Sequence, residues 1–358
     1  MPLFNLNPKE SPEELFGRAT ELDELVRMVK AKRWVAVLGP RMVGKTSLIK
    51  VANVELEEAG FKTIYVNLWG ARRTQGLLNA LAQGLNSARG LLQKIKDAIG
   101  RIEGVSFGPG GVSISAPRRP MTTTRDLLAA VGREGGDCVI ELDEVQEVAA
   151  ISRDLLRMLA NVFNTYPNIV FVFTGSLFGL LKTLLEPGAS SPLYGRSPAK
   201  LYLQPFNKQE ATDFLRKGFD EYRMEVDESL INAAVEQLNG FPGWLTLYGN
   251  NVSVRRIRHK DALNETISEG LKIVGDELEH YLNGRDRAGH LAALRAAATA
   301  TRWSRIKGAI EVRKGAAVND KSVYTILESL KAAMLIDEEG GVYRVKDPML
   351  RTFLLTPK

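Results

Sequence analysis

Gly39-Pro-Arg-Met-Val-Gly44-Lys45-Thr46 decides the fold, because it fits Gly-x-x-x-x-Gly-Lys-[Ser/Thr] at every fixed position. The apolar run Trp34–Leu38 precedes it, and a helical pattern, Ser47–Ala59, follows. A strand, a glycine-rich loop and a helix in this order form a phosphate-binding loop, whose backbone N–H groups and helix N-terminus face the phosphates. We expect Lys45 to neutralise the β- and γ-phosphates and the Thr46 hydroxyl to bind Mg²⁺. The predicted nucleotide-binding residues are Gly39, Pro40, Arg41, Met42, Val43, Gly44, Lys45, Thr46 and Ser47.

Four more short apolar runs have the composition of covered strands, and helical stretches separate them. They are Thr63–Leu68, Cys138–Leu142, Ile169–Phe173 and Leu201–Leu203. This alternation predicts an α/β fold with a parallel sheet. Between the second and third strands, the Gly-rich alternating stretch Val105–Ser115 predicts a small exposed hairpin.

The third strand runs directly into two acids, in Val139-Ile-Glu-Leu-Asp143-Glu144. An acid there can hold Mg²⁺, which we expect of Asp143, and Glu144 can activate water against the γ-phosphate. An apolar run that ends in two acids is weak evidence for a nucleotide site by itself, but it is strong evidence when the chain also has a phosphate-binding loop. Glu141, inside the same run, has no explanation from the sequence.

The fourth strand ends in Thr174-Gly175-Ser176. Two roles are open for the Ser176 hydroxyl. It can polarise the attacking water or sense the γ-phosphate, or it can cap the following helix, Leu177–Leu184.

Four further segments complete a family resemblance. They are Phe16-Gly17-Arg18-Ala-Thr-Glu21-Leu22, Pro192-Leu-Tyr194-Gly195-Arg196, Asn239-Gly240-Phe241-Pro242-Gly243 and Tyr343-Arg-Val-Lys-Asp347-Pro348. With the Walker A loop (Gly39–Thr46) and the Walker B acids (Asp143, Glu144), the chain resembles the archaeal ATPase family, a branch of the STAND class of signalling NTPases related to AAA+ proteins.

The resemblance implies a sheet order of 5-1-4-3-2, a helical lid and a C-terminal winged helix. It implies that Phe16 and Arg18 lie near the adenine, that Arg196 lies near the nucleotide and that Pro242 of the lid contacts it. Other roles stay open: a surface position for Arg18, a bond from Arg196 to a neighbouring carboxylate, and a helix start for Pro242. The preference for ATP/ADP also rests on the resemblance, because the residues alone leave GTP open.

The chain departs from AAA+ proteins in its lid. Where those proteins usually offer an arginine, this chain has Gly240-Phe-Pro242, as switch-type STAND proteins do. The departure argues against a processive motor. The expected domains are a P-loop core over 1–205, a lid over 206–286 and a winged helix over 287–358.

The C-terminal fifth is basic, with 12 Lys or Arg against 7 Asp or Glu from His290 onward, compared with 36 against 35 elsewhere. Its helical runs and the turn at Gly340-Gly341 predict a winged helix, a common reader of duplex DNA. A protein contact, or clamping of the core, is the alternative. The predicted DNA contacts are Lys321, Thr325, Lys331 and Arg344.

Other features limit the class of protein. The single cysteine, Cys138, lies in an apolar run and is expected to be a buried small hydrophobe, which fits a cytoplasmic protein. No run approaches the roughly 18 apolar residues that a membrane helix needs, so no membrane partner is expected.

These features predict a Mg²⁺-dependent ATPase that acts as a nucleotide-driven switch with slow basal turnover. Glu144 would be the base, with Lys45, Mg²⁺ and Arg196 stabilising charge. The alternative is an oligomeric AAA+ ATPase acting on DNA, such as a loader or a mobile-element helper.

Overall fold

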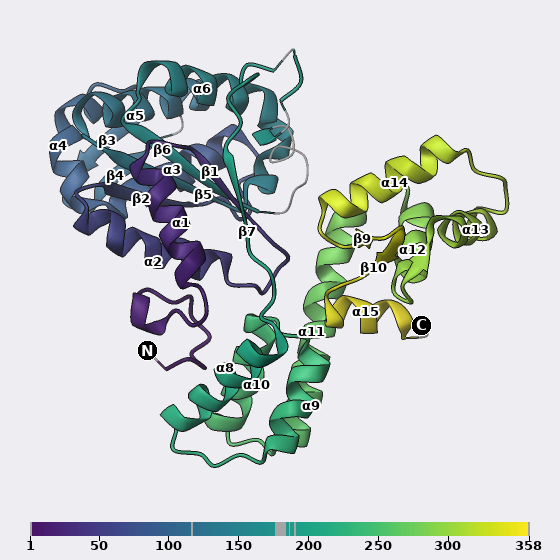
Figure 1. Ribbon diagram of the computed structural model, residues 1–358. Coiled ribbons are helices and arrows are strands. Elements are labelled where there is room, and N and C mark those ends of the chain that lie inside the picture. The colour runs from purple at the N-terminus through teal and green to yellow at the C-terminus, as the bar shows by residue number, and fades with distance from the viewer. Residues whose placement is uncertain (1, 116, 176–183, 186, 190, 357–358) are drawn as a thin grey trace. The chain divides into compact units, whose positions relative to one another are not determined.

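The computed structural model describes residues 2–115, 117–175, 184–185, 187–189 and 191–356, which fall into two compact units. The α/β unit comprises Lys9–Gly39 and Lys45–Leu203. The helical unit comprises Met1–Pro8, Pro40–Gly44 and Gln204–Lys358. Figure 1 labels the elements of both.

A five-stranded parallel sheet forms the centre of the α/β unit (Figure 1). Its strands are β1 (Val35–Leu38), β2 (Lys62–Asn67), β5 (Cys138–Asp143), β6 (Ile169–Thr174) and β7 (Ala199–Tyr202). They lie in the order β2-β5-β6-β1-β7, which confirms the predicted 5-1-4-3-2 arrangement. The register pairs Asn67 with Asp143 and Leu142 with Phe173, so the polar residues Asn67, Asp143 and Thr174 meet at the carboxyl edge of the sheet.

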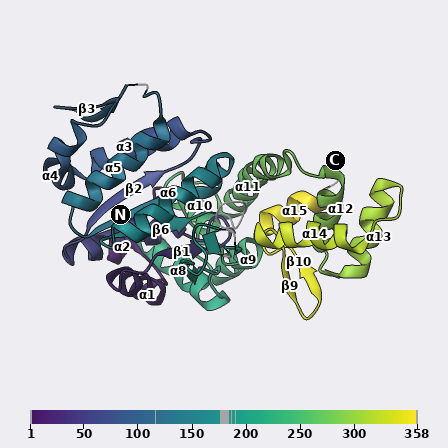
Figure 2. The same cartoon turned by 90° about the horizontal axis from the view of Figure 1, so that it is seen from above.

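Helices cover both faces of this sheet (Figure 2). One face packs against α3 (Thr74–Ser87), α5 (Pro120–Glu134) and α6 (Ser152–Thr165) through apolar side chains such as Leu81, Leu128 and Phe171. The other face carries α1 (Ala19–Lys30) and α2 (Lys45–Glu58). Because successive strand residues point to opposite faces, Ile140 faces α3 and α5 while Glu141 faces α2.

The predicted hairpin is present as β3 (Val105–Gly108) and β4 (Gly111–Ile114), after helix α4 (Arg89–Ile99). It is less exposed than expected, because Val105 and Val112 are buried. The Asn86 side chain at the end of α3 accepts from Val112 N at 2.6 Å and donates to Val112 O at 2.9 Å. The hairpin is therefore fixed to α3.

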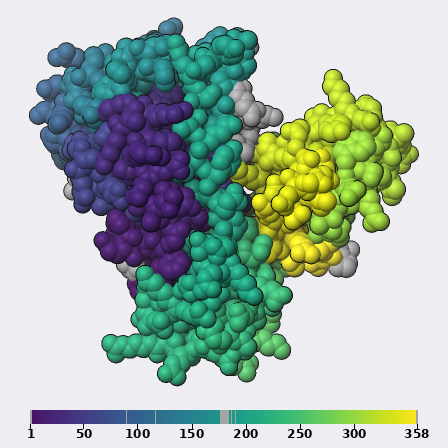
Figure 3. All heavy atoms as spheres, in the orientation of Figure 1, coloured from purple at the N-terminus to yellow at the C-terminus, as the bar shows by residue number. Residues whose placement is uncertain are grey.

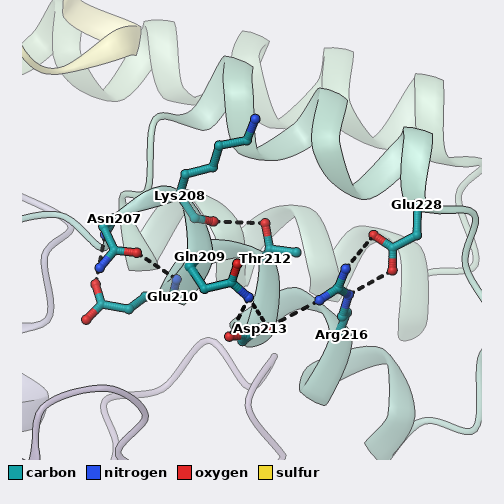
Figure 4. Close-up of polar contacts among 8 residues, drawn as sticks. All are labelled: Asn207, Lys208, Gln209, Glu210, Thr212, Asp213, Arg216 and Glu228. Carbon is teal, nitrogen blue, oxygen red and sulfur yellow. Dashed lines mark hydrogen bonds and ion pairs between the residues drawn. The ribbon is translucent and has the colours of Figure 1, made fainter.

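The lid of the helical unit consists of α8 (Lys208–Glu221), α9 (Glu228–Leu238), α10 (Pro242–Ser253) and α11 (His259–Leu282). Asn207 and Glu210 form a reciprocal capping box at the start of α8, and Arg216 binds Glu228 of α9 through both carboxylate oxygens (Figure 4). These helices form the closely packed green group in Figure 3.

Residues 2–8 pack with the lid. The buried Phe4 ring lies where a side chain on Gly218 of α8 or Gly249 of α10 would be, and Asn250 Nδ2 donates to Phe4 O at 2.9 Å. Leu3 N donates to a Glu221 carboxylate oxygen at 2.6 Å. The small residues of α8 and α10 thus make room for the N-terminal aromatic ring.

The C-terminal domain is a winged helix, as predicted. Its helices are α12 (Arg287–Ala297), α13 (Trp303–Lys314), α14 (Asp320–Ala332) and α15 (Pro348–Leu355). Its strands β9 (Asp337–Glu339) and β10 (Val342–Arg344) pair with β8 (Thr301–Arg302), a short strand that the sequence did not indicate. The domain shares one apolar core with the end of α11, through residues such as Leu282, Leu294 and Leu327.

Two simpler expectations can be compared with the structure. Cys138 is buried, and burial raises the pKa of its thiol to about 12, which confirms a small core residue rather than a nucleophile. Within the described ranges, no helix has the length and apolar character to cross a membrane.

Candidate nucleotide site

The predicted phosphate-binding loop joins β1 to α2, and its backbone takes the conformations that such a loop needs. Gly44 has φ +94°, a region open mainly to glycine, and Met42 has φ +62°, which is unusual for a residue with a long side chain. Lys45 Nζ donates to Gly39 O at 2.9 Å. The lysine thus folds back over the loop, with its ammonium group held near the space that phosphates would fill.

The tip of this loop, Pro40–Gly44, belongs to the helical unit. Gly243 N at the start of α10 donates to Met42 O at 2.8 Å. A Cβ on Gly243 would lie 2.6 Å from the end of the Met42 side chain, so this position needs a small residue. Arg41 Nε also lies 2.6 Å from a carboxylate oxygen of Glu277 on α11. Pro242, the residue predicted to contact the nucleotide from the lid, therefore directly precedes Gly243, which donates a hydrogen bond to the loop.

Asp143 accepts hydrogen bonds from several elements at the carboxyl edge. Tyr65 OH donates to Oδ2 at 2.6 Å, Thr46 Oγ1 donates to Oδ2 at 3.2 Å, and Glu144 N donates to Oδ1 at 3.1 Å. Thr174 Oγ1 donates to Oδ1 as well. Burial and the Asp143 carboxylate raise the pKa of Tyr65, so its hydroxyl stays protonated as a donor.

The pairing of Thr46 with Asp143 brings a hydroxyl and a carboxylate oxygen together from α2 and β5. Oxygen atoms of this kind are the ligands that Mg²⁺ prefers, usually with water and substrate phosphates completing the shell. The residues predicted to hold Mg²⁺ therefore fit the ion. The contact between the two side chains is itself what the sequence led us to expect.

Glu144 follows Asp143 in a left-handed backbone conformation, with φ +59°. Its carboxylate accepts a hydrogen bond from the side-chain amide of Gln146. Gln146 in turn lies against Gly175 at the end of β6, where an added Cβ would be 2.2 Å from Gln146 Oε1. The predicted base therefore bonds to an amide that lies close to the end of β6.

Glu141 receives an explanation from the structure. It is fully buried and accepts from Asn53 Nδ2 of α2 at 2.9 Å. Burial raises the pKa of this carboxyl to about 8, against the opposing effect of the Asn53 bond. The pair ties the helix that carries Thr46 to the strand that carries Asp143.

The Phe16–Arg18 segment lies at the start of α1. Arg18 is buried and bonds to Glu21 at 2.9 Å. The alternative interpretation, a surface position for Arg18, is therefore wrong. The N-terminal segment also reaches α2, where Lys9 N donates to Ser47 Oγ at 3.1 Å. The adenine contacts of Phe16 and Arg18 stay predictions.

Arg196 does not lie at its own chain's loop. Its guanidinium lies 5.4 Å from the ring centroid of Phe163, which is 5.1 Å from that of Trp34. Trp34 precedes β1, whereas the phosphate-binding loop follows β1, so Arg196 is at the opposite edge of the sheet. The length of β1 separates Arg196 from the phosphate-binding loop of its own chain, so the role of Arg196 near a nucleotide stays a prediction. Among the described residues, no carboxylate forms an ion pair with Arg196, and its guanidinium lies against the Phe163 ring instead.

Ser176 and most of the helix expected after it lie outside the described residues. The hydroxyl that meets Asp143 belongs to Thr174, two residues earlier. The sequence could have indicated Thr174, because this hydroxyl residue ends the apolar run of the fourth strand. It could not have indicated Tyr65, Asn53 or Gln146, since their hydrogen-bond partners depend on sheet register and local turn geometry.

The predicted DNA contacts have mixed surroundings. Lys321 and Thr325 are exposed on α14. Lys331 instead binds Glu328 at 2.6 Å and Glu338 at 3.0 Å, and Arg344 lies 3.6 Å from Glu339. Nearby acids therefore neutralise the charge of two of the four predicted DNA contacts, Lys331 and Arg344.

Comparison with known families agrees with this architecture. A family model described as an ATPase domain predominantly from Archaea matches residues 15–247, and one for the C-terminal winged helix-turn-helix domain of MCM proteins matches residues 285–345. No curated protein matches the chain.

Solved structures extend the comparison to nearly the whole chain. It is similar to the Walker-type ATPase PABY2304 of Pyrococcus abyssi, with 28% identity, coverage of 98% of this chain and 99% of that chain, and a TM-score of 0.79. The fold is also similar to that of Aeropyrum pernix ORC2 in its ADP form, with 15% identity, 99% and 98% coverage and a TM-score of 0.58. It is similar as well to that of Aeropyrum pernix ORC1 in complex with DNA, with 16% identity, coverage of 99% of this chain and 96% of that chain, and a TM-score of 0.53.

Proposed function

This chain belongs to the family of ATPase domains found predominantly in Archaea, and from that premise we propose that it is a Mg²⁺-dependent ATPase working as a nucleotide-driven conformational switch. The observation that carries the proposal is the bonding of the loop tip. Met42 O accepts from Gly243 N of the lid, and Arg41 binds Glu277 of α11. Phosphates that engage the loop would act on residues already bonded to the lid.

The path from the lid to the winged helix is continuous within the helical unit. Helix α11 carries Glu277 and continues to Leu282, which lies in the winged-helix core. Met349 and Phe353 of α15 pack against Gly270 and Gly275 of α11. A shift of α11 would therefore be transmitted to the winged helix as a rigid movement.

The chemistry assigns one role to each residue of the site. Lys45 would leave Gly39 O for the phosphates, and Thr46 and Asp143 would hold Mg²⁺. Bound Mg²⁺ supplies positive charge to the phosphate oxygens. Glu144 would accept the proton of the attacking water. Arg196 has no part within the same chain.

Slow basal turnover follows from the bond between Gln146 and Glu144. The carboxylate must leave the amide before it can accept a proton from water. A single hydrogen bond contributes about 1 kcal/mol, which corresponds to roughly fivefold in the population of the released form. A partner that displaces Gln146 would raise the rate.

A second function, an oligomeric ATPase acting on DNA, is favoured by the position of Arg196. At the edge of the sheet remote from its own loop, this arginine would stabilise charge only at another chain's site. The similarity in fold to an ORC1 protein in complex with DNA agrees with this alternative.

The test is ATP turnover with Mg²⁺ for wild type and Glu144→Gln, with and without duplex DNA, together with small-angle scattering of Glu144→Gln in ADP and ATP. The switch predicts slow turnover indifferent to DNA and a shape that differs between nucleotides. ATP-dependent oligomers with turnover stimulated by DNA would establish the second function instead. No binding of ATP would contradict both.

A further inference from the structure

The winged helix pairs most of its acids with its own cations. Six of the seven acids between His290 and the C-terminus take part in such ion pairs. The pairs are Lys307 with Glu311 and Asp320, Lys331 with Glu328 and Glu338, Lys346 with Asp337, and Arg344 with Glu339. The wing and the C-terminal half of α14 are thereby neutralised.

The basic excess of the domain therefore lies elsewhere. Exposed cations that form no ion pair with any described acid lie on several elements of the domain. They are Lys321 at the start of α14, Arg302, Arg305 and Arg313 on or beside α13, Arg295 on α12 and Arg351 on α15. In Figures 1 and 2, α13 and α14 are neighbouring helices of the domain.

An aromatic pair lies at the same helices. The rings of Trp303 on α13 and Tyr324 on α14 are stacked, with centroids 5.6 Å apart and an interplanar angle of 29°. Trp303 is half-buried, and Tyr324 is 54% exposed. Because Trp303 stacks against one face of the tyrosine ring, only the other face remains for a ligand to stack on. Lys321 and Tyr324 are three residues apart, on one side of α14.

We propose that Tyr324, supported by Trp303, stacks with an unpaired base of a single-stranded nucleic acid, while Lys321 and the arginines beside Trp303 bind its phosphates. The ligand is identified by two features that occur together: surplus positive charge for a polyanion and a free ring face for a planar group. The proposal goes beyond the proposed function, because it assigns a ligand to the winged helix, and it does not depend on ATP turnover.

A single strand fits these residues better than a duplex. Inside a duplex each base face is covered by its neighbours, and a protein meets only base edges. Stacking of a base on an aromatic side chain contributes about 1–3 kcal/mol and tolerates any sequence. Few unneutralised cations are needed when stacking supplies part of the affinity.

The experiment is fluorescence anisotropy of the full chain with a labelled oligothymidylate, without nucleotide, at several salt concentrations. Tyr324→Ala should weaken binding by about 5- to 100-fold, whereas Tyr324→Phe, which keeps the ring, should bind within about twofold of wild type. Tyr324→Leu keeps apolar contact with Trp303 without a ring and should resemble the alanine variant. Tyr202→Ala removes a tyrosine that is 47% exposed in the α/β unit and should have no effect.

A second readout isolates the cations. Lys321→Ala should lower the slope of log K against log salt by about 0.7, the value for one phosphate contact on a single strand. Lys331→Ala should leave the slope unchanged, because its ammonium group is held by Glu328 and Glu338.

Three outcomes would overturn the proposal: equal affinity of Tyr324→Ala and wild type, tighter binding of duplex than of oligothymidylate, or equally effective competition by polyglutamate, which has charge without rings. ATP turnover measured on the same preparations separates this failure from failure of the proposed function. Normal turnover with no binding of the single strand would contradict only the stacking role.

Discussion

The carboxyl edge of the sheet and the exposed side of the winged helix both gather polar residues, but they use them differently. At the sheet edge, hydroxyls of Thr46, Tyr65 and Thr174 converge on one carboxylate, Asp143. On the winged helix, cations such as Lys331 and Arg344 are paired with nearby acids. The first arrangement makes a site from residues far apart in the sequence, whereas the second removes charge that the sequence seemed to offer.

The largest expected effect follows from removing the carboxylate of the sheet edge. Asp143→Ala should reduce Mg²⁺-dependent ATP turnover by about 10²–10³-fold or more, because it removes a residue predicted to hold the ion. It should also lower the free energy of unfolding by about 3 kcal/mol, since buried donors lose their acceptor. Turnover assays and urea unfolding check both. If Asp143→Ala were as stable as Lys331→Ala, the two regions would not differ as described.

The same substitution made in each region sharpens the comparison. Thr174 Oγ1 donates to Asp143, whereas Thr325 Oγ1 donates only to the carbonyl of Lys321 in its own helix. Thr174→Val should lower ATP turnover about tenfold, which corresponds to the loss of roughly 1.4 kcal/mol of stabilisation. Thr325→Val should leave turnover unchanged. Equal turnover of the two variants would remove Thr174 from the site.

The amide that holds the base predicts a change in the opposite direction. Gln146→Ala should raise basal turnover about fivefold, because Glu144 no longer has to leave a hydrogen bond of about 1 kcal/mol. Gln209→Ala is the matched control, since the Gln209 amide also bonds to a carboxylate, at 3.0 Å from Asp213, but on the lid. A rate for Gln146→Ala below that of wild type would show that the amide orients the base rather than restrains it.

Smaller effects are expected on the wing. Lys331→Ala and Arg344→Ala should each change the free energy of unfolding by less than about 1 kcal/mol, because their ion pairs are at the surface. Affinity for duplex DNA should also stay close to that of wild type, which equilibrium binding at two salt concentrations would measure. A large loss of DNA affinity in either variant would show that the substituted residue contacts DNA despite its ion pair.

The smallest effect concerns pH in the winged-helix core. Burial lowers the pKa of His290 below its ordinary value of 6.5. The unfolded chain therefore binds more protons than the folded chain as pH falls below that value, and stability decreases toward acid pH. His290→Gln should weaken this dependence in urea unfolding between pH 7 and pH 5. An unchanged slope would mean that His259, whose pKa burial also lowers, carries it alone.

The sequence predicted those parts of the fold that depend on local pattern. A glycine-rich loop must lie between a strand and a helix, and parallel strands place their carboxyl ends at one edge, so the contact of Thr46 with Asp143 could be expected. Strand order came from family resemblance rather than from the residues themselves. The assignment of 1–205, 206–286 and 287–358 as domains stays a prediction, because contacts alone place Met1–Pro8 and Pro40–Gly44 with the helical unit.

Side-chain partners were harder to predict than positions. The contact of Thr174 with Asp143 was not foreseen, because the sequence does not say which hydroxyl of a triplet points toward the neighbouring strand, and the role of Ser176 stays a prediction. The surroundings of Arg196 could not be foreseen, since a loop connecting distant elements can lie at either edge of a sheet, and its role at a nucleotide stays a prediction. Charge was misread on the wing because Lys331 pairs with Glu338, which is close to it only after the wing has folded.

The most direct test of the account is ATP turnover with Mg²⁺ for three proteins side by side: wild type, Glu144→Gln and Gln146→Ala. Slow turnover in wild type, none in Glu144→Gln and a severalfold increase in Gln146→Ala would support a restrained base in an ATPase switch. Turnover that persists in Glu144→Gln, or fast wild-type turnover unaffected by Gln146→Ala, would contradict it.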